Sequence, residues 1–254
     1  MLKTSAAPVA VFDSGIGGIG VLQELKKALP HENFLYFGDT ANAPYGTRPK
    51  EEILALVERH AARLQRRAKA LVLACNTATA VAAEALRLCY RDLPIIGIEP
   101  AVKPATLCKT HPTVLILATP TTLAGHKLAD LQAAYGQSAT FIGCAAPELV
   151  TLIEDGHLDD DLTAAYLKAL LTPLLQGNVP DAVVLGCTHF PFAKAAISRF
   201  FGGVVPFFDG AEGTAREAAR RMAALGLCNK QKKRGTVLLQ ASNPSSLALM
   251  QKLL

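Results

Sequence analysis

The stretch Leu71-Val-Leu-Ala-Cys-Asn-Thr77 is matched later in the chain by Val183-Val-Leu-Gly-Cys-Thr-His189. In each stretch, a short apolar run ends in a small residue, a cysteine and two polar side chains. Short continuous apolar runs are typical of strands buried on both faces of a parallel sheet, whose carboxyl edge is where ligands bind. The two stretches therefore predict two parallel sheets, each with a cysteine at its ligand-binding edge.

A second pair of similar segments precedes the first pair in each half of the chain. Val9-Ala-Val-Phe-Asp-Ser14 and Val114-Leu-Ile-Leu-Ala-Thr119 each lead into a segment with helical periodicity. Phe34-Leu-Tyr-Phe-Gly38 and Thr140-Phe-Ile-Gly143 follow those segments as further strands. Because the same order of segments occurs twice, the sequence predicts two related halves.

Apolar runs alternate with helix-period segments along the whole chain, which is the pattern of βαβ units. The predicted strands are 9–12, 34–37, 71–73, 95–96, 114–117, 140–142, 182–185, 204–208 and 236–240. The predicted helices are 21–28, 50–69, 79–90, 123–135, 161–175 and 192–200, with one long helix after Gly210 and another at the end. We expect an α/β fold of two similar, doubly wound domains with mostly parallel sheets and the active site in the cleft between them. Residues 1–97 with 210–254 form the first predicted domain, and 98–209 form the second.

Composition restricts the class of protein. The chain has 254 residues and is 50% hydrophobic, which is enough for a sizeable core. It has no run of 18 or more apolar residues and no apolar signal at its start, so we expect a cytoplasmic protein without membrane contact. The formal charge of +5 is spread over short patches, which disfavours nucleic-acid binding. The six cysteines include no C-x-x-C pair and are expected to be reduced thiols.

One glycine-rich segment resembles a dinucleotide-binding motif. Gly15-Ile-Gly-Gly-Ile-Gly20 matches G-x-G-x-x-G, and Asp39 lies where a ribose-binding acid is expected. Asp13 argues against this interpretation, because its charge at the strand end would repel a pyrophosphate at the same helix N-terminus. An Asp13-Ser14 pair is better suited to binding an ammonium group or orienting a base.

Cys75 and Cys187 are the candidate reactive groups. Each follows a strand and leads into a predicted helix, whose unpaired N–H groups stabilise a thiolate and lower the pKa below about 8.5. A lone cysteine of this kind is most often a small buried apolar residue. Because the same polar context occurs twice, that simpler explanation is disfavoured for these two and kept for Cys89, Cys108, Cys144 and Cys228.

Two further uses of these residues compete. Cys187 and His189 could be zinc ligands, but no second pair with zinc-ligand spacing is present, so we expect no metal site. His189 could instead activate Cys187 as a nucleophile, which would leave Cys75 without a function. Two matching acid–base groups are what inversion at an acidic carbon requires, because one removes the α-proton from one face while the other returns a proton to the opposite face.

Five segments together resemble the glutamate racemases of the Asp/Glu racemase family. They are Asp13-Ser-Gly-Ile-Gly-Gly18, Gly38-Asp-Thr-Ala-Asn-Ala-Pro-Tyr-Gly46, Ala74-Cys-Asn-Thr-Ala78, Ile98-Glu-Pro-Ala101 and Gly186-Cys-Thr-His-Phe-Pro191. The resemblance extends from about Val9 to Thr214. It implies cofactor-independent interconversion of L- and D-glutamate for peptidoglycan synthesis, in a protein that is usually a homodimer.

The resemblance also implies residue roles. Cys75 would deprotonate D-glutamate with help from Asp13, and Cys187 would deprotonate L-glutamate with help from His189 and Glu154. The implied substrate-binding residues are Asp13, Ser14, Pro44, Tyr45, Gly46, Asn76, Thr77, Thr119, Thr122, Thr188 and His189. Ala118 and Pro120 depart from the Gly-Thr-like opening that we expect around Thr119. Simpler explanations remain: Asp13 and Thr77 could cap helices, Tyr45-Gly46 could be an ordinary turn, and Glu154 could be a surface carboxylate.

Other functions remain open at this stage. A related cofactor-independent enzyme acting on aspartate, a hydantoin or maleate would share the paired cysteines. A binding role, toward a dinucleotide or a protein such as a topoisomerase, is the non-enzymatic alternative.

Overall fold

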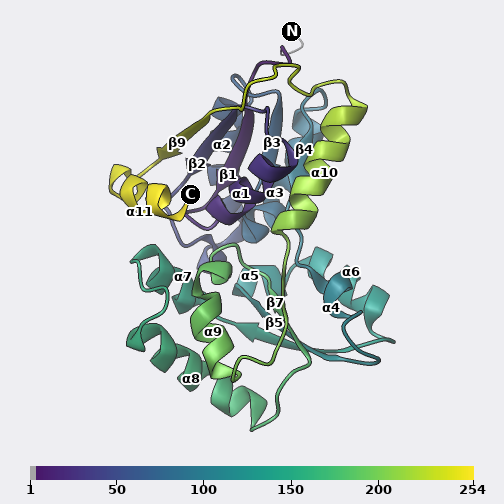
Figure 1. Ribbon diagram of the computed structural model, residues 1–254, viewed down its shortest axis with the longest axis vertical. Helices are drawn as coiled ribbons and strands as arrows, with labels where there is room; N and C mark the ends of the chain where they lie inside the picture. The colour runs from purple at the N-terminus through teal and green to yellow at the C-terminus, as the bar shows by residue number, and fades with distance from the viewer. Residues whose placement is uncertain (1–3) are drawn as a thin grey trace. The chain divides into compact units, whose positions relative to one another are not determined.

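The computed structural model describes residues 4–254, which divide into two compact units. Unit 1 comprises the described residues up to Ile98 together with Ala211–Leu254, and unit 2 comprises Glu99–Gly210. Each unit has its own parallel sheet with helices around it (Figure 1). The predicted α/β class with two parallel sheets is confirmed.

Unit 1 is built on a five-stranded sheet in the order β4-β3-β1-β2-β9, in which every neighbouring pair is parallel. Its strands are β1 (Val9–Asp13), β2 (Phe34–Gly38), β3 (Ala70–Leu73), β4 (Ile95–Gly97) and β9 (Val237–Ala241). Its helices are α1 (Ile19–Ala28), η1 (Tyr45–Thr47), α2 (Lys50–Leu64), α3 (Asn76–Cys89), α10 (Ala211–Ala224), η3 (Pro244–Ser246) and α11 (Leu247–Leu253). The C-terminal strand β9 therefore joins the sheet formed by the start of the chain.

Unit 2 is built on a four-stranded parallel sheet in the order β6-β5-β7-β8. Its strands are β5 (Thr113–Ala118), β6 (Thr140–Ala145), β7 (Ala182–Leu185) and β8 (Phe207–Asp209). Its helices are α4 (Val102–Ala105), α5 (Pro120–Leu123), α6 (His126–Tyr135), α7 (Pro147–Glu154), α8 (Asp161–Leu175), η2 (Phe190–Ala193) and α9 (Lys194–Phe200). In Figure 1, α4 and α6 lie on one side of this sheet, and α7, α8 and α9 lie on the other.

The two units repeat one topology. The order β4-β3-β1-β2 in unit 1 has the same form as β8-β7-β5-β6 in unit 2, so β1, β2, β3 and β4 correspond to β5, β6, β7 and β8. Cys75 follows β3 and Cys187 follows β7. The two cysteines therefore occupy equivalent places in their own units, as the repeated sequence predicts.

Strands β1, β2 and β3 are buried at every position, so both faces of the sheet are covered there. One face of the unit 1 sheet packs against α2 and α3 in a single apolar cluster that includes Phe12, Leu35, Leu71, Val57 and Ala82. Burying a large aliphatic or aromatic side chain contributes about 1.5–3 kcal/mol each. Because this packing holds the strands in place, it also fixes where the turns at their carboxyl ends begin.

Several predicted boundaries were wrong. The predicted helix 123–135 is two helices, because Gly125 has an extended backbone and interrupts it before α6. The predicted helix 50–69 ends at Leu64, and the predicted strand 204–208 pairs only from Phe207, after Pro206, which has no N–H to donate. The short helices α4 and α7 were not predicted. No helix within residues 4–254 is long and apolar enough to cross a bilayer.

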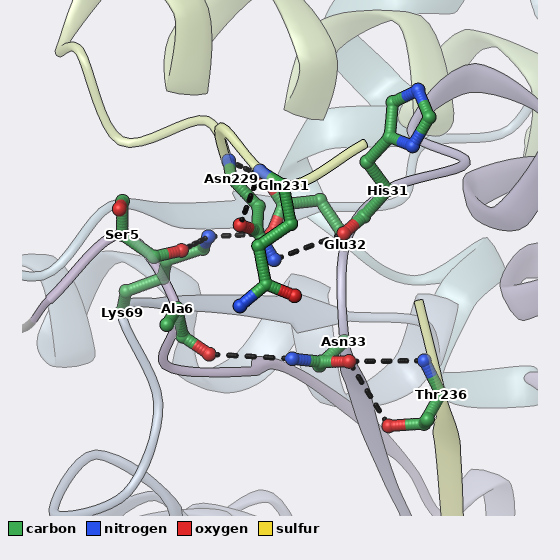
Figure 2. Close-up of polar contacts among 9 residues, drawn as sticks. All are labelled: Ser5, Ala6, His31, Glu32, Asn33, Lys69, Asn229, Gln231 and Thr236. Atoms are coloured by element: carbon green, nitrogen blue, oxygen red, sulfur yellow. Dashed lines mark hydrogen bonds and ion pairs between the residues drawn. The ribbon is translucent and has the colours of Figure 1, made fainter. Parts of the chain in front are cut away.

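A buried ion pair lies near the amino ends of β2 and β3 (Figure 2). Lys69 Nζ donates to Glu32 Oε2 at 2.5 Å and also to the carbonyl oxygen of Ser5. Glu32 Oε1 accepts the backbone N–H of Asn229 at 2.6 Å. Both charged side chains are almost fully buried, so each depends on these partners for the hydrogen bonds lost from water.

The same network holds the C-terminal segment against unit 1. Asn33 Oδ1 accepts the backbone N–H and the hydroxyl of Thr236, each at 3.0 Å, and Asn33 Nδ2 donates to the carbonyl of Ala6 (Figure 2). Asn229 Nδ2 donates to the carbonyl of His31 at 3.0 Å. The chain that leads to β9 is therefore fixed at the amino edge of the sheet.

Replacing Lys69 by methionine is expected to destabilise the protein by about 3–5 kcal/mol, because it leaves the Glu32 carboxylate buried without its partner. The free energy of unfolding, measured by urea denaturation, tests this. The double variant Glu32→Gln/Lys69→Met should be more stable than Lys69→Met alone. Lys27→Met, which removes an exposed ion pair with Glu24, is the matched control and should change little. Equal losses in Lys69→Met and Lys27→Met would contradict this account.

Candidate functional site

Polar side chains follow β1 and β3, which are neighbours in the unit 1 sheet. Asp13 is the last residue of β1 and is fully buried, and its Oδ1 accepts the backbone N–H of Gly15 at 2.8 Å. Ser14 Oγ lies 3.3 Å from Cys75 Sγ. The turn after β1 therefore brings a carboxylate and a hydroxyl to the end of the strand that precedes Cys75.

Cys75 is the N-cap of α3, and its Sγ accepts the backbone N–H of Ala78 at 3.4 Å. An N-cap side chain receives an unpaired amide hydrogen and lies at the positive end of the helix dipole. Both effects favour the thiolate over the thiol. The predicted position of Cys75 at the start of a helix is confirmed.

Asn76 and Thr77 form the first turn of α3 and are buried. Asn76 Oδ1 has no hydrogen-bond partner among the described residues. A buried carbonyl oxygen without a partner costs about 1–3 kcal/mol, and such atoms often receive a donor from a ligand. Asn76 therefore offers an acceptor beside Cys75.

The segment Pro44–Gly46 lies after β2, beside the same edge of the sheet. Tyr45 is buried, and its hydroxyl donates to Asp39 Oδ2 at 2.6 Å. Burial and the neighbouring Asp39 raise the pKa of Tyr45, so the hydroxyl remains a donor. This hydroxyl is therefore committed to Asp39, and the Tyr45 ring packs beside Phe12 in the apolar cluster.

Unit 2 presents its own polar group after β5. Thr119 is the N-cap of α5: its Oγ1 accepts the backbone N–H of Thr122 at 3.3 Å and lies 3.0 Å from the Thr122 hydroxyl. Both threonines are buried. The two hydroxyls therefore lie together at the carboxyl end of β5, next to β7 in the sheet.

Cys187 heads a chain of polar contacts after β7. Its Sγ lies 3.7 Å from His189 Nδ1, and His189 Nε2 lies 2.6 Å from Glu154 Oε1 at the end of α7. Thr188 lies between the cysteine and the histidine and is buried. A thiol, an imidazole and a carboxylate in sequence form an arrangement in which the carboxylate orients the base.

The charge state of His189 follows from its two partners. Burial alone would lower the pKa of His189, but hydrogen bonds to Cys187 and Glu154 raise it well above its usual value of 6.5. Because the pKa of His189 is higher in the folded state than in the unfolded state, these interactions stabilise the folded protein fully below about pH 6.5. This stabilisation is lost as the pH rises through the pKa that His189 has in the folded state.

The prediction that Cys187 repeats the helix start at Cys75 was wrong. After Cys187 the chain makes a turn, a 3₁₀ helix over Phe190–Ala193, and only then α9. Pro191 is well suited to the first turn of such a helix, because it has no N–H to leave unpaired. Cys187 therefore has a histidine where Cys75 has helix amides.

The remaining cysteines differ from these two. Burial raises the pKa of Cys144 to about 11, as expected for a thiol in an apolar environment. Cys89 and Cys108 are exposed, and Cys228 is partly exposed. Within residues 4–254, no group of three or more His, Cys, Asp or Glu side chains is arranged to hold a metal ion.

Asp39 does not fit the dinucleotide interpretation. Its carboxylate is fully buried and accepts hydrogen bonds from Tyr45 and Asn42, so it is not available to a ribose. Sequence reasoning missed the contacts of this residue with Asn42 and Tyr45. Its position directly after β2, followed by Asn42 and Tyr45, was the available signal.

Comparison of the sequence with known protein families identifies its relatives. The model of the Asp/Glu/hydantoin racemase family matches residues 20–218. The chain belongs to the Asp/Glu/hydantoin racemase family. It is therefore a racemase, an isomerase, and the resemblance seen in its sequence motifs is confirmed.

Individual relatives of this racemase cover nearly its whole length. The glutamate racemase of Clostridium novyi is 41% identical over 251 residues, which span 97% of this chain and 96% of the relative. The glutamate racemase of Thermus thermophilus, solved with beta-chloro-D-alanine, is 35% identical with a TM-score of 0.77, covering 99% of this chain and 94% of that one. The Escherichia coli glutamate racemase, solved with L-glutamate and the activator UDP-MurNAc-ala, is 29% identical with a TM-score of 0.80, covering 97% and 95%.

Removing the Glu154 charge by Glu154→Gln is expected to lower the pKa of His189, because the carboxylate is one of the two groups that raise it. Titration of the imidazole nitrogens by ¹⁵N NMR measures this. Glu148→Gln, an exposed change in the same helix, is the control and should leave the midpoint unchanged. Identical midpoints in both variants would mean that Glu154 does not control His189.

Proposed function

We propose that this racemase interconverts L- and D-glutamate without a cofactor, using Cys75 and Cys187 as the two acid–base groups. The carrying observation is that β3 and β7 are equivalent strands, and each delivers a buried thiol with a polar partner at its carboxyl end. Relatives named glutamate racemase, at about 40% identity over most of the chain, support glutamate as the substrate.

In the proposed reaction, the Cys75 thiolate removes the α-proton of D-glutamate, so that the C–H bond breaks and an S–H bond forms. The Cys187 thiol then gives its proton to the opposite face of the carbanion, which yields L-glutamate. Afterwards Cys75 is a thiol and Cys187 a thiolate, which is the state that the reverse reaction needs. Because the two groups exchange protonation states, each turnover prepares the enzyme for the other hand of substrate.

Each thiol has its own assistance in this proposal. Asp13 assists Cys75, and the amide of Ala78 and the dipole of α3 stabilise its thiolate. His189, oriented by Glu154, assists Cys187. Donors aimed at the substrate carboxylates must stabilise the carbanion, because no cofactor delocalises it.

Substrate contacts are proposed at the turns that leave the strands. In unit 1 they involve the side chains or backbone of Asp13, Ser14, Pro44, Tyr45, Gly46, Asn76 and Thr77. In unit 2 they involve Thr119, Thr122, Thr188 and His189. The unpartnered Asn76 Oδ1 suits the substrate ammonium, which is a donor only.

The biological setting is part of the proposal. We propose that the enzyme acts in the cytoplasm as a homodimer and supplies D-glutamate for peptidoglycan. The family resemblance supports each of these points. Light scattering coupled to size-exclusion chromatography tests the dimer.

In deuterated water without added cofactor, conversion of L-glutamate should place deuterium at the α-carbon of the D-glutamate product before it appears in remaining L-glutamate. Two bases on opposite faces predict this order, because the proton returned comes from a different group. Mass spectrometry of the separated enantiomers at early times measures it. Equal early labelling of both pools would indicate a single base. L-Aspartate and a chiral 5-substituted hydantoin, run in parallel, test the related substrates.

Cys75→Ser and Cys187→Ser should each abolish steady racemisation, because an alcohol is far less acidic than a thiol. Optical rotation follows the reaction. Cys89→Ser, at an exposed cysteine, is the matched control and should retain wild-type turnover. Near-wild-type turnover in either active-site variant would exclude the two-base assignment.

A further inference from the structure

The C-terminal segment reaches the strand ends that carry the unit 1 site residues. β9 pairs with β2 in a register that places Ala241 beside Gly38, and Ser242 follows directly. The Ser242 N–H donates to the carbonyl of Gly38 at 2.9 Å, and its Oγ accepts the N–H of Ala41 at 2.8 Å. A side chain from the end of the chain therefore holds the start of the loop after β2.

Helix α11 adds close packing at the same place. A Cβ atom on Gly38 would lie 2.6 Å from Met250 Cε and 2.4 Å from the carbonyl oxygen of Gly15. Met250 is fully buried, and Gln23 Nε2 in α1 donates to the carbonyl of Leu253 at 2.8 Å. The end of the chain is thus fitted against the turns after β1 and β2.

Asp39 is the centre of the loop that Ser242 holds. It accepts hydrogen bonds from Tyr45 Oη at 2.6 Å and from Asn42 Nδ2 at 3.0 Å. His60 Nε2 lies 3.1 Å from Asp39 Oδ2 without the alignment of a hydrogen bond. Asp39 therefore binds Tyr45 and Asn42 within the same loop whose Ala41 N–H is bound by Ser242.

The protonation state of Asp39 makes this connection strong. Burial alone would raise the pKa of Asp39, but contacts from His60, Tyr45, Asn42 and Ser242 outweigh burial and hold it well below its usual range. The carboxylate is ionised, and hydrogen bonds to an ionised acceptor are about twice as strong as neutral ones. The loop is also fixed at Thr40, whose Oγ1 accepts the N–H of Asn243 at 3.1 Å.

We infer that Asp39 and Ser242 are positioning residues for the substrate-binding segment Pro44–Gly46, so that the C-terminal strand contributes to glutamate binding without touching glutamate. This inference rests on the proposed function, in which Tyr45 and Gly46 contact the substrate. Asp39 acts through the Tyr45 hydroxyl, and Ser242 acts through the backbone of Ala41 in the same loop. A loop that is free to move would bind the substrate less tightly in every state of the reaction.

The expected kinetic signature is a change in KM rather than in kcat. Weakening a contact made equally in the ground state and the transition state raises KM and leaves kcat nearly unchanged. Loss of one hydrogen bond predicts a rise in the KM for glutamate of about 3- to 10-fold in Ser242→Ala. A residue needed only for folding would lower the melting temperature and leave KM unchanged in the folded fraction.

The test measures KM, kcat and melting temperature for Ser242→Ala, Ser242→Thr and Ser245→Ala in the full-length protein. Ser242→Thr keeps the hydroxyl and should restore KM to within about twofold of wild type. Ser245→Ala removes a nearby exposed hydroxyl that donates to Asn243 Oδ1 at 2.9 Å, and it should change neither constant. An unchanged KM in Ser242→Ala, or an equal rise in Ser245→Ala, would overturn the inference.

A double-mutant cycle tests the route through Asp39. Asp39→Asn and Tyr45→Phe should each raise KM, and the double variant should raise it by less than the product of the two changes, because both act on one hydrogen bond. Purely multiplicative effects would overturn that route. If the wild-type protein fails to racemise glutamate, the proposed function itself fails, and this inference falls with it. The wild-type assay alone tests the proposed function, whereas the comparison of the variants with wild type tests this inference.

Discussion

The site residues depend on one constraint, which is that both sheets are entirely parallel. Parallel strands deliver all their carboxyl ends to the same edge, so the turns after β1, β2 and β3 lie side by side in unit 1. The turns after β5 and β7 do the same in unit 2. A thiol placed at such an edge is held by a buried strand on one side and a helix or turn on the other, which gives it a fixed direction.

The two thiols have different polar neighbours. Cys75 receives an amide hydrogen at the start of α3 and lies beside the Ser14 hydroxyl. Cys187 lacks a helix start and has the imidazole of His189, whose charge Glu154 supports. In the proposed mechanism, each cysteine is a thiolate in one direction and a thiol in the other. Equivalent strands with different neighbours show how a repeated fold can adjust its two halves separately.

The sequence was informative where the signal is local. The apolar run before Cys75 and the small polar residues after it predicted a strand and a helix start, and both are present. It failed at Cys187, where the repeated pattern predicted a helix start. The chain forms a 3₁₀ helix over Phe190–Ala193 instead, with Pro191 in its first turn. The break at Gly125 was missed for a related reason, since a helical pattern on both sides of one glycine resembles one long helix.

Long-range contacts could not be predicted from the pattern. Glu154 was associated with Cys187 by resemblance alone, and only the fold shows it 2.6 Å from His189. Ser242 and Ala41 are far apart in sequence, and neither residue carries a local signal that pairs them. Their connection arises because β9 returns to pair with β2 in parallel register. The C-terminal segment is therefore part of the loop scaffold as well as of the sheet.

The central claim is that one sulfur atom lies on each side of a single substrate carbon. A crystal structure of the protein with bound D-glutamate tests it most directly. The account predicts the Sγ atoms of Cys75 and Cys187 on opposite faces of the α-carbon, each about 3–4 Å from it. A complex in which only one Sγ approaches that carbon, or both approach from the same face, would contradict it.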